Sequence, residues 1–171
     1  SKELKKAYTK KLLTFIDVSL LPKLRIMVNS GNGAAGPTFD ELESLLASST
    51  NKLSFEKVHH MPDSSFPNGI PNPLLSKNHK DNKDLTLKAG ANLGIAFDGD
   101  FDRCFFFDEN GNFIPGQYIV GLLAETFLLK EPGAKIIHDP RVIWNIQNVV
   151  EKNGGIAIKS KTGHAFIKQS M

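Results

Sequence analysis

Residues 93–103 read Leu-Gly-Ile-Ala-Phe-Asp-Gly-Asp-Phe-Asp-Arg, an apolar run followed by three aspartates at alternate positions. The apolar run is typical of a buried strand. Because the glycine that follows the first aspartate lets the backbone turn tightly, we expect Asp98, Asp100 and Asp102 to face one point. Three clustered carboxylates repel one another, and a hard cation such as Mg²⁺ relieves that repulsion and prefers carboxylate oxygens. The pattern therefore predicts a divalent-metal loop at the end of a strand.

The next residue, Arg103, adds a planar guanidinium suited to phosphate, so the loop indicates phosphoryl transfer. Three other interpretations stay open. A calcium loop would have Glu109 at its twelfth position, but an arginine replaces the glycine required at the sixth. A phosphatase of the haloacid-dehalogenase kind would use Asp98 as nucleophile and Asp100 as acid, and it leaves Asp102 unexplained. In a solvated acidic turn, the three carboxylates would repel one another with no cation to offset their charge.

The composition describes a chain that can bury a core, with 171 residues and 40% hydrophobic content. Its net charge of +3 is small and its lysines lack interleaved aromatics, which argues against a nucleic-acid partner. No apolar run approaches the about 20 residues of a membrane span, and the lysine-rich start lacks the apolar region of a signal peptide. We therefore predict a cytoplasmic protein without membrane contact. The single cysteine, Cys104, agrees with a reducing compartment and is expected in the core.

Hydrophobic periodicity predicts an alternation of helices and strands over the first two thirds of the chain. The loop that follows the second strand contains four prolines, which excludes a regular helix or central strand there. The expected elements are a helix over 3–19, a strand over 24–29, a helix marked by leucines 42, 45 and 46, a strand over 53–58, the proline loop 59–73, a helix over 74–88, strands over 93–97 and 104–107, and a turn at 108–111.

A second α/β unit begins after that turn, so we expect a boundary near Asn112 and two domains, 1–112 and 113–171. Its expected elements are a helix over 117–129, a strand over 134–138, a helix over 142–152, a strand over 156–159 and the start of a helix at 165. Two or three strands cannot form a covered sheet, so we expect the chain to be truncated in its second domain.

The glycine loop Gly31–Gly36 has the spacing of a dinucleotide-binding fingerprint, with Glu56 at the expected distance beyond it. A tight strand-to-helix turn needs the same glycines, so a dinucleotide-binding module stays an alternative. His59 and His60, with Asp63 nearby, are metal-ligand residue types, but adjacent strand residues point to opposite faces and do not easily share an ion.

Two further candidates follow strands of the second unit. Arg141 comes after Asp139-Pro140, and His164 ends the loop Ser160-Lys161-Thr162-Gly163 before a helix. Parallel strands gather ligand-binding residues at their carboxyl ends, and a helix N-terminus attracts anions. We therefore expect both side chains to approach an anionic substrate.

Four segments together resemble the bacterial phosphomannomutases of the α-D-phosphohexomutase family over essentially the whole chain. They are Asp98–Arg103, Asn29–Gly36, Pro67–Pro73 and Thr162–Lys168. The resemblance implies a three-layer α/β domain followed by a partial second α/β unit. It also implies a four-domain enzyme in which a phosphoserine donates its phosphoryl group to a hexose phosphate. Mannose 6-phosphate and mannose 1-phosphate would then interconvert through a bisphosphate.

The resemblance assigns Mg²⁺ to the three aspartates and contact with the substrate or the phosphoserine to Arg103. It places His164 and Arg141 at the sugar-binding face. The family's serine loop, Ala-Ser-His-Asn-Pro, and its sugar loop, Gly-Glu-Met-Ser, are absent from this sequence. Residues 1–112 then correspond to domain 2 and residues 113–171 to the first part of domain 3. We expect the chain to be inactive without the missing domains, and the choice between mannose and glucose phosphate stays open.

Overall fold

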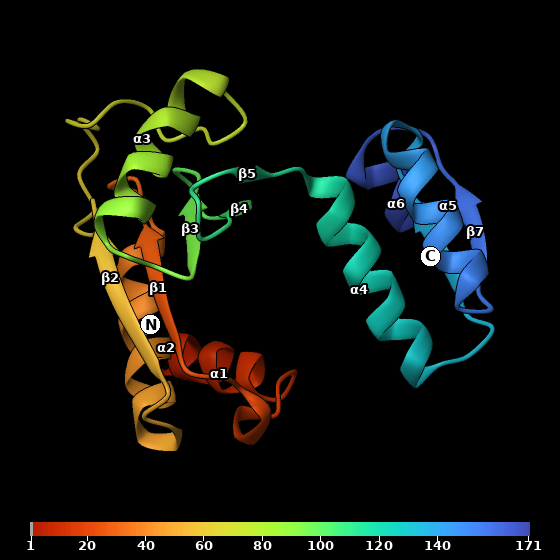
Figure 1. Ribbon diagram of the computed structural model, residues 1–171, viewed down its shortest axis with the longest axis horizontal. Helices are drawn as coiled ribbons and strands as arrows, with labels where there is room; N and C mark the ends of the chain where they lie inside the picture. Colours follow the sequence, from red (N-terminus) through yellow and green to blue (C-terminus); the bar gives the residue numbers. More distant parts are fainter. Residues whose placement is uncertain (1) are drawn as a thin grey trace. The chain divides into compact units, whose positions relative to one another are not determined.

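The computed structural model describes residues 2–171, except for the side chains of residues 2, 142–144 and 164. The chain forms two compact units, Ser1–Phe113 and Ile114–Met171 (Figure 1). Each unit has its own sheet and its own hydrophobic core.

The first unit is organised around a five-stranded sheet in the order β2-β1-β3-β4-β5. Its strands are β1 Leu24–Asn29, β2 Leu53–Val58, β3 Leu93–Phe97, β4 Cys104–Phe107 and the short β5 Phe113–Ile114. β1 pairs in parallel with both β2 and β3, whereas β4 runs antiparallel to β3. The carboxyl ends of β1, β2 and β3 therefore meet at one edge of the sheet.

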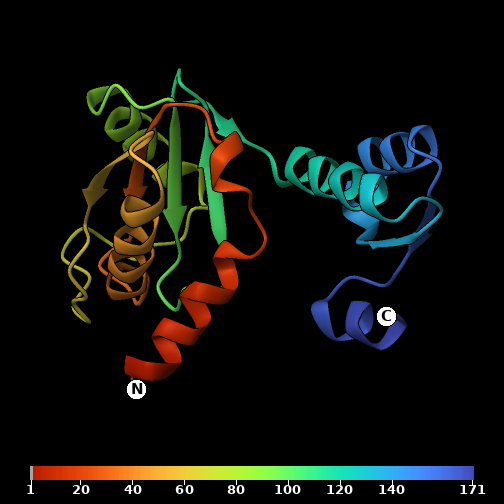
Figure 2. The same ribbon diagram turned by 90° about the horizontal axis from the view of Figure 1, so that it is seen from below.

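Helices cover both faces of this sheet (Figures 1 and 2). Ile26 and Val28 of β1 pack with Phe39 of α2, while Met27 between them packs with Ala89 at the end of α3. Because successive strand residues point to opposite faces, the sheet is the middle of three layers. The helical elements are α1 Lys2–Leu13, the 3-10 turn η1 Val18–Leu20, α2 Ala35–Ser49 and α3 Ser76–Lys88.

The second unit has a two-stranded parallel sheet, formed by β6 Lys135–His138 and β7 Ile156–Lys159. Four buried residues form its core: Ala124 and Leu128 from α4, and Ile146 and Val150 from α5. Its helical elements are α4 Gly116–Lys130, η2 Pro140–Val142, α5 Ile143–Lys152 and α6 His164–Ser170. The residues that follow β6 and β7 lie at the same edge of this small sheet, because the strands are parallel.

The α/β class and the three-layer arrangement are confirmed, and five predicted strands match the structure residue for residue. The prediction of one helix over 3–19 is wrong, because α1 ends at Leu13 and Asp17 caps the separate turn η1. Phe15 and Ile16 had the right spacing for a buried stripe, but they are 65% and 44% exposed. The sequence analysis also missed β5, which has only two residues. No helix within residues 2–171 is long and apolar enough to cross a membrane.

The packing of β1 generates a prediction about stability. Met27 is fully buried between the sheet and α3, so Met27→Ala leaves a cavity and should lower the free energy of unfolding by about 2–5 kcal/mol. Leu20→Ala removes a side chain that is 79% exposed and should change it by less than about 0.5 kcal/mol. Urea unfolding followed by circular dichroism measures both, and equal effects of the two substitutions would contradict this core.

Candidate metal centre

Three loops meet at the carboxyl edge of the first sheet. They are residues 30–34 after β1, which include the start of the glycine loop, residues 59–75 after β2, which include the proline loop, and residues 98–103 after β3, the aspartate loop. The chain leaves β1 for β2 on one side and returns through β3 on the other. The edge between β1 and β3 is therefore a topological switch point, where open α/β sheets bind ligands.

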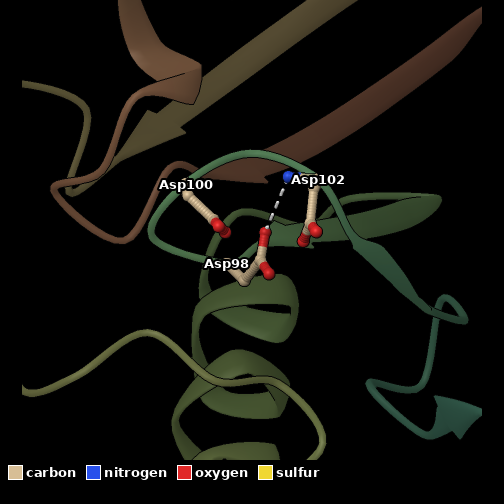
Figure 3. Close-up of side chains that lie close together, drawn as sticks. All are labelled: Asp98, Asp100 and Asp102. Atoms are coloured by element: carbon tan, nitrogen blue, oxygen red, sulfur yellow. Dashed lines mark hydrogen bonds between the residues drawn. The ribbon is translucent and has the colours of Figure 1, made fainter.

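The aspartate loop brings its three carboxylates together as the sequence predicts. Asp98, Asp100 and Asp102 each offer one oxygen, and these oxygens lie within 4.8 Å of one another. Figure 3 shows the three side chains converging inside the turn of the loop. Asp98 is 1% exposed, whereas the other two reach solvent. In the described part of the chain, this is the only cluster of histidine, cysteine or carboxylate groups with such spacing.

Backbone hydrogen bonds fix the position of Asp98. Its Oδ1 accepts from the amides of Asp102 and Arg103, each at 3.1 Å, and the first of these bonds is drawn in Figure 3. Phe101 has a left-handed backbone, with φ of 65°, and its ring packs edge-on against Phe97 at 4.9 Å. The loop therefore curls around its first carboxylate.

The second oxygen of Asp98 is buried and has no hydrogen bond within the described residues. The Nε of Arg103 lies 2.6 Å away, but its N–H donates to Asp102 Oδ1 at 3.1 Å. Burial alone would raise the pKa of Asp98, but the amide hydrogen bond from Arg103, the interaction with the side chain of Asp102 and the charge of Arg103 lower the pKa below its ordinary value. An ionised buried oxygen without a hydrogen bond, next to two more carboxylates, fits a hard divalent cation.

The glycine loop supports the aspartate loop directly. The amide of Ala34, just before α2, donates to the carbonyl oxygen of Gly99 at 3.0 Å. A Cβ on Gly33 would lie 2.5 Å from that oxygen and 2.9 Å from the Cα of Gly99, so only glycine allows the approach. The amide at the start of α2 is thus already bonded to protein. A dinucleotide-binding role for Gly31–Gly36 is not favoured.

The proline loop closes the other side of the glycine and aspartate loops. A Cβ on Gly99 would lie 3.4 Å from the ring of Phe66 and 3.5 Å from that of Pro71. Asn32 of the glycine loop accepts a hydrogen bond from Asn68 at 2.8 Å. The proline loop therefore packs against both other loops, a contact that its sequence alone did not indicate.

His59 and His60 lie just beyond the end of β2, at the start of the predicted proline loop, so the alternation of strand side chains does not apply to them. His59 has a left-handed backbone, with φ of 45°; burial lowers its pKa, and the nearby charge of Asp81 opposes that effect. Asp63 accepts hydrogen bonds from Ser65 instead of approaching the histidines. The side chains of His59 and Asp63 therefore make separate contacts.

His60 takes part in a hydrogen-bond chain that the sequence analysis missed. Its Nε2 lies 2.8 Å from Asp40 Oδ1, and its Nδ1 lies 3.4 Å from the hydroxyl of Ser30. This order of groups is that of a nucleophilic triad, but Ser30 is fully buried. Lys57 also contacts Asp40, at 2.9 Å, so the chain ties β2 and the proline loop to α2.

Cys104 is exposed, which corrects its expected place in the core. It begins β4 and lines an open groove of about 310 Å³ with Tyr8 and Leu12 of α1, so it keeps contact with solvent. Partial burial and the negative charge of Asp98 raise the pKa of its thiol.

The second unit carries the other two candidates. Arg141 follows β6, its side chain is 74% exposed, and its guanidinium pairs with Asp139. The side chain of His164 lies outside the described residues; its backbone begins α6 directly after Gly163.

The fold and the three loops define an α/β/α domain with a carboxylate site at its switch point. Two family models match the chain in succession: "Phosphoglucomutase/phosphomannomutase, alpha/beta/alpha domain II" over residues 6–111 and the corresponding domain III over residues 115–171. The chain belongs to the phosphoglucomutase/phosphomannomutase family, and the resemblance seen in its sequence is confirmed.

Similar proteins agree with this family. Phosphomannomutase of Salmonella montevideo is 57% identical over 168 residues, which are 98% of this chain and 37% of that protein. Phosphomannomutase of Escherichia coli K12 is 56% identical with the same coverage. A phosphoglucomutase/phosphomannomutase family protein of Burkholderia thailandensis superposes with a TM-score of 0.88 at 30% identity, over 98% of this chain and 35% of that one. The chain thus spans little more than a third of these relatives.

The contact between the glycine and aspartate loops generates a prediction. Gly33→Ala should displace the backbone of Gly99 and weaken Mn²⁺ binding by about tenfold or more, as expected when support of a metal site is disturbed. Gly116→Ala is the matched control, because a Cβ there meets nothing within 4 Å. Electron paramagnetic resonance of free Mn²⁺ measures the affinity. Unchanged affinity in a folded Gly33→Ala protein would show that the contact does not support the site.

Proposed function

We propose that this chain is the middle part of a phosphomannomutase, a phosphohexomutase that interconverts mannose 6-phosphate and mannose 1-phosphate. The phosphoryl donor would be a phosphoserine in a part of the enzyme that these 171 residues do not include, and the intermediate a hexose bisphosphate. Residues 1–112 would serve as domain 2 and residues 113–171 as the first part of domain 3. Identity of 57% to a bacterial phosphomannomutase over 98% of the chain supports this assignment.

The convergence of Asp98, Asp100 and Asp102 is the observation that carries the proposal. Their oxygens would hold Mg²⁺, which when bound offsets negative charge on a phosphoryl group in transfer. A structure of Aspergillus fumigatus N-acetylphosphoglucosamine mutase, described as a complex with GlcNAc-6P and magnesium, shares the fold with a TM-score of 0.64 at 17% identity. The buried Oδ2 of Asp98 accepts no hydrogen bond among the described residues and is ion-paired only with Arg103, and together with the two neighbouring carboxylates it gives this chain its own argument for a cation.

Arg103 would contact the phosphate of the substrate or of the phosphoserine. Its hydrogen bond to Asp102 and the charge of Asp98 raise its pKa, so the guanidinium stays charged. The side chain is 49% exposed, which leaves part of its fork accessible to an anion. Arg141 and His164 would bind the hexose phosphate from the second unit. Mannose phosphate is the proposed substrate, and glucose phosphate is the competitor to compare with it.

The burial of Asp98 also bears on the phosphatase alternative. A carboxylate nucleophile must reach a phosphorus atom, but Asp98 is 1% exposed and one of its oxygens binds two backbone amides. The same carboxylate is well placed as a fixed ligand. A role of Asp98 as nucleophile is therefore not favoured. The proposed location is the cytoplasm, which the single unpaired cysteine fits.

The proposal is tested with the full-length protein that contains this chain. With Mg²⁺ and a hexose bisphosphate activator, it should convert mannose 1-phosphate, and Asp100→Asn should lower kcat by about 100-fold or more because the cation loses a ligand. Asp84→Asn removes the same charge from the exposed face of α3 and should leave kcat within about twofold. A coupled assay for mannose 6-phosphate measures both rates.

The 171-residue chain is expected to show no turnover in the same assay, since it has neither the serine loop nor the sugar loop. Full activity of Asp100→Asn, or turnover by the 171-residue chain alone, would contradict the proposal.

A further inference from the structure

Arg141 is held by a neighbouring carboxylate at the end of β6. Asp139 Oδ1 accepts from the backbone amide of Arg141 at 2.9 Å and from its Nε at 2.8 Å. Asp139 Oδ2 accepts from Nη2 at 2.9 Å. The two side chains therefore form a two-point, planar pair, the geometry in which an arginine and a carboxylate bind each other most specifically.

Burial differs sharply between the two partners. The side chain of Asp139 is 16% exposed, while that of Arg141 is 74% exposed. The hydrogen bonds from Arg141 lower the pKa of Asp139, to which the charge of His138 also contributes, so the carboxylate is an anion at neutral pH. A mostly buried anion thus fixes an otherwise solvent-exposed arginine. The guanidinium is held in one orientation instead of sampling many rotamers.

The pair leaves much of the guanidinium free to bind. Arginine has five N–H donors, and the pair uses one on Nε and one on Nη2. The remaining three have no acceptor among the described residues. They lie on an exposed side chain at the carboxyl end of a parallel strand, where ligands gather in α/β folds. A fixed fork with free donors is suited to an oxyanion such as a phosphate.

We propose that Asp139 is a positioning residue that orients Arg141 toward an anionic oxygen of the hexose phosphate. The proposal rests on the proposed function, because it takes the hexose phosphate as the ligand of Arg141. It adds that the carboxylate of Asp139, which does not itself touch the substrate, determines how well Arg141 binds it.

Asp139 also has a structural role, which the test must separate from its effect on the side chain of Arg141. Its Oδ1 also accepts the backbone amide of Arg141 across Pro140, which shapes the turn that leads into α5. Asp139→Asn keeps an oxygen for this backbone bond but replaces the Oδ2 acceptor with an amide that cannot accept from Nη2. This variant therefore keeps the turn and breaks the two-point pair.

Kinetics of the full-length protein form the first part of the test. Asp139→Asn should raise KM for mannose 1-phosphate about tenfold and leave kcat within about twofold. Arg141→Ala should raise KM at least as much, and the double variant should be no worse than Arg141→Ala alone, because Asp139 acts through that arginine. An unchanged KM in Asp139→Asn, or a double variant worse than Arg141→Ala, would overturn the proposal.

Nuclear magnetic resonance of the 171-residue chain gives a readout that needs no activity. The Nη2–H signal of Arg141, whose acceptor is Asp139 Oδ2, should be protected from solvent exchange and should shift on addition of mannose 1-phosphate. In Asp139→Asn it should lose both properties, and a protected signal that still shifts in that variant would overturn the proposal. A full-length protein without mutase activity would contradict the proposed function, and the Arg141 signal would still show whether Asp139 orients Arg141.

Discussion

The hydrogen bond from the amide of Ala34 to the carbonyl of Gly99 joins two loops that are far apart in the sequence. It forms only because Gly33 lets the backbones touch, since a side chain there would overlap Gly99. β1 and β3 are parallel neighbours, so their carboxyl ends bring these loops together. In the same contact, the amide of Ala34 at the start of α2 already donates to a protein oxygen. A loop with the spacing of a nucleotide site thereby supports the aspartate loop, which is the proposed metal site.

The charges of the aspartate loop are balanced around this support. Asp98 is buried but ionised, because two backbone amides and the nearby guanidinium of Arg103 compensate its charge. Asp100 and Asp102 remain open to solvent at the mouth of the site. The site thus has one fixed carboxylate and two accessible ones, an arrangement in which a small divalent cation can bind and keep positions for phosphate oxygens.

Much of the fold could be predicted from local pattern. β1, β3 and β4 are mainly apolar runs, β2 mixes apolar and polar residues, and the alternating aspartates indicated their own convergence. Exposure could not be predicted in this way, so the helix over 3–19 was extended too far and Cys104 was placed in the core. The contact of Gly33 with Gly99 depends on tertiary approach and left no local signal. The segment Asp139-Pro140-Arg141 did contain a local signal, because aspartate before proline favours a turn in which the carboxylate accepts a nearby backbone amide.

The central claim is that residues 98–103 form a preorganised divalent-metal site, and Mn²⁺ titration of isotope-labelled chain tests it most directly. Paramagnetic broadening should be strongest for the amides from Gly99 to Arg103, because the three carboxylates converge within that loop. Asp100→Asn should abolish this selective broadening while the rest of the spectrum stays unchanged. If millimolar Mn²⁺ leaves these amides sharp, or broadens them equally in Asp100→Asn, the loop does not bind the cation through its aspartates and the account is wrong.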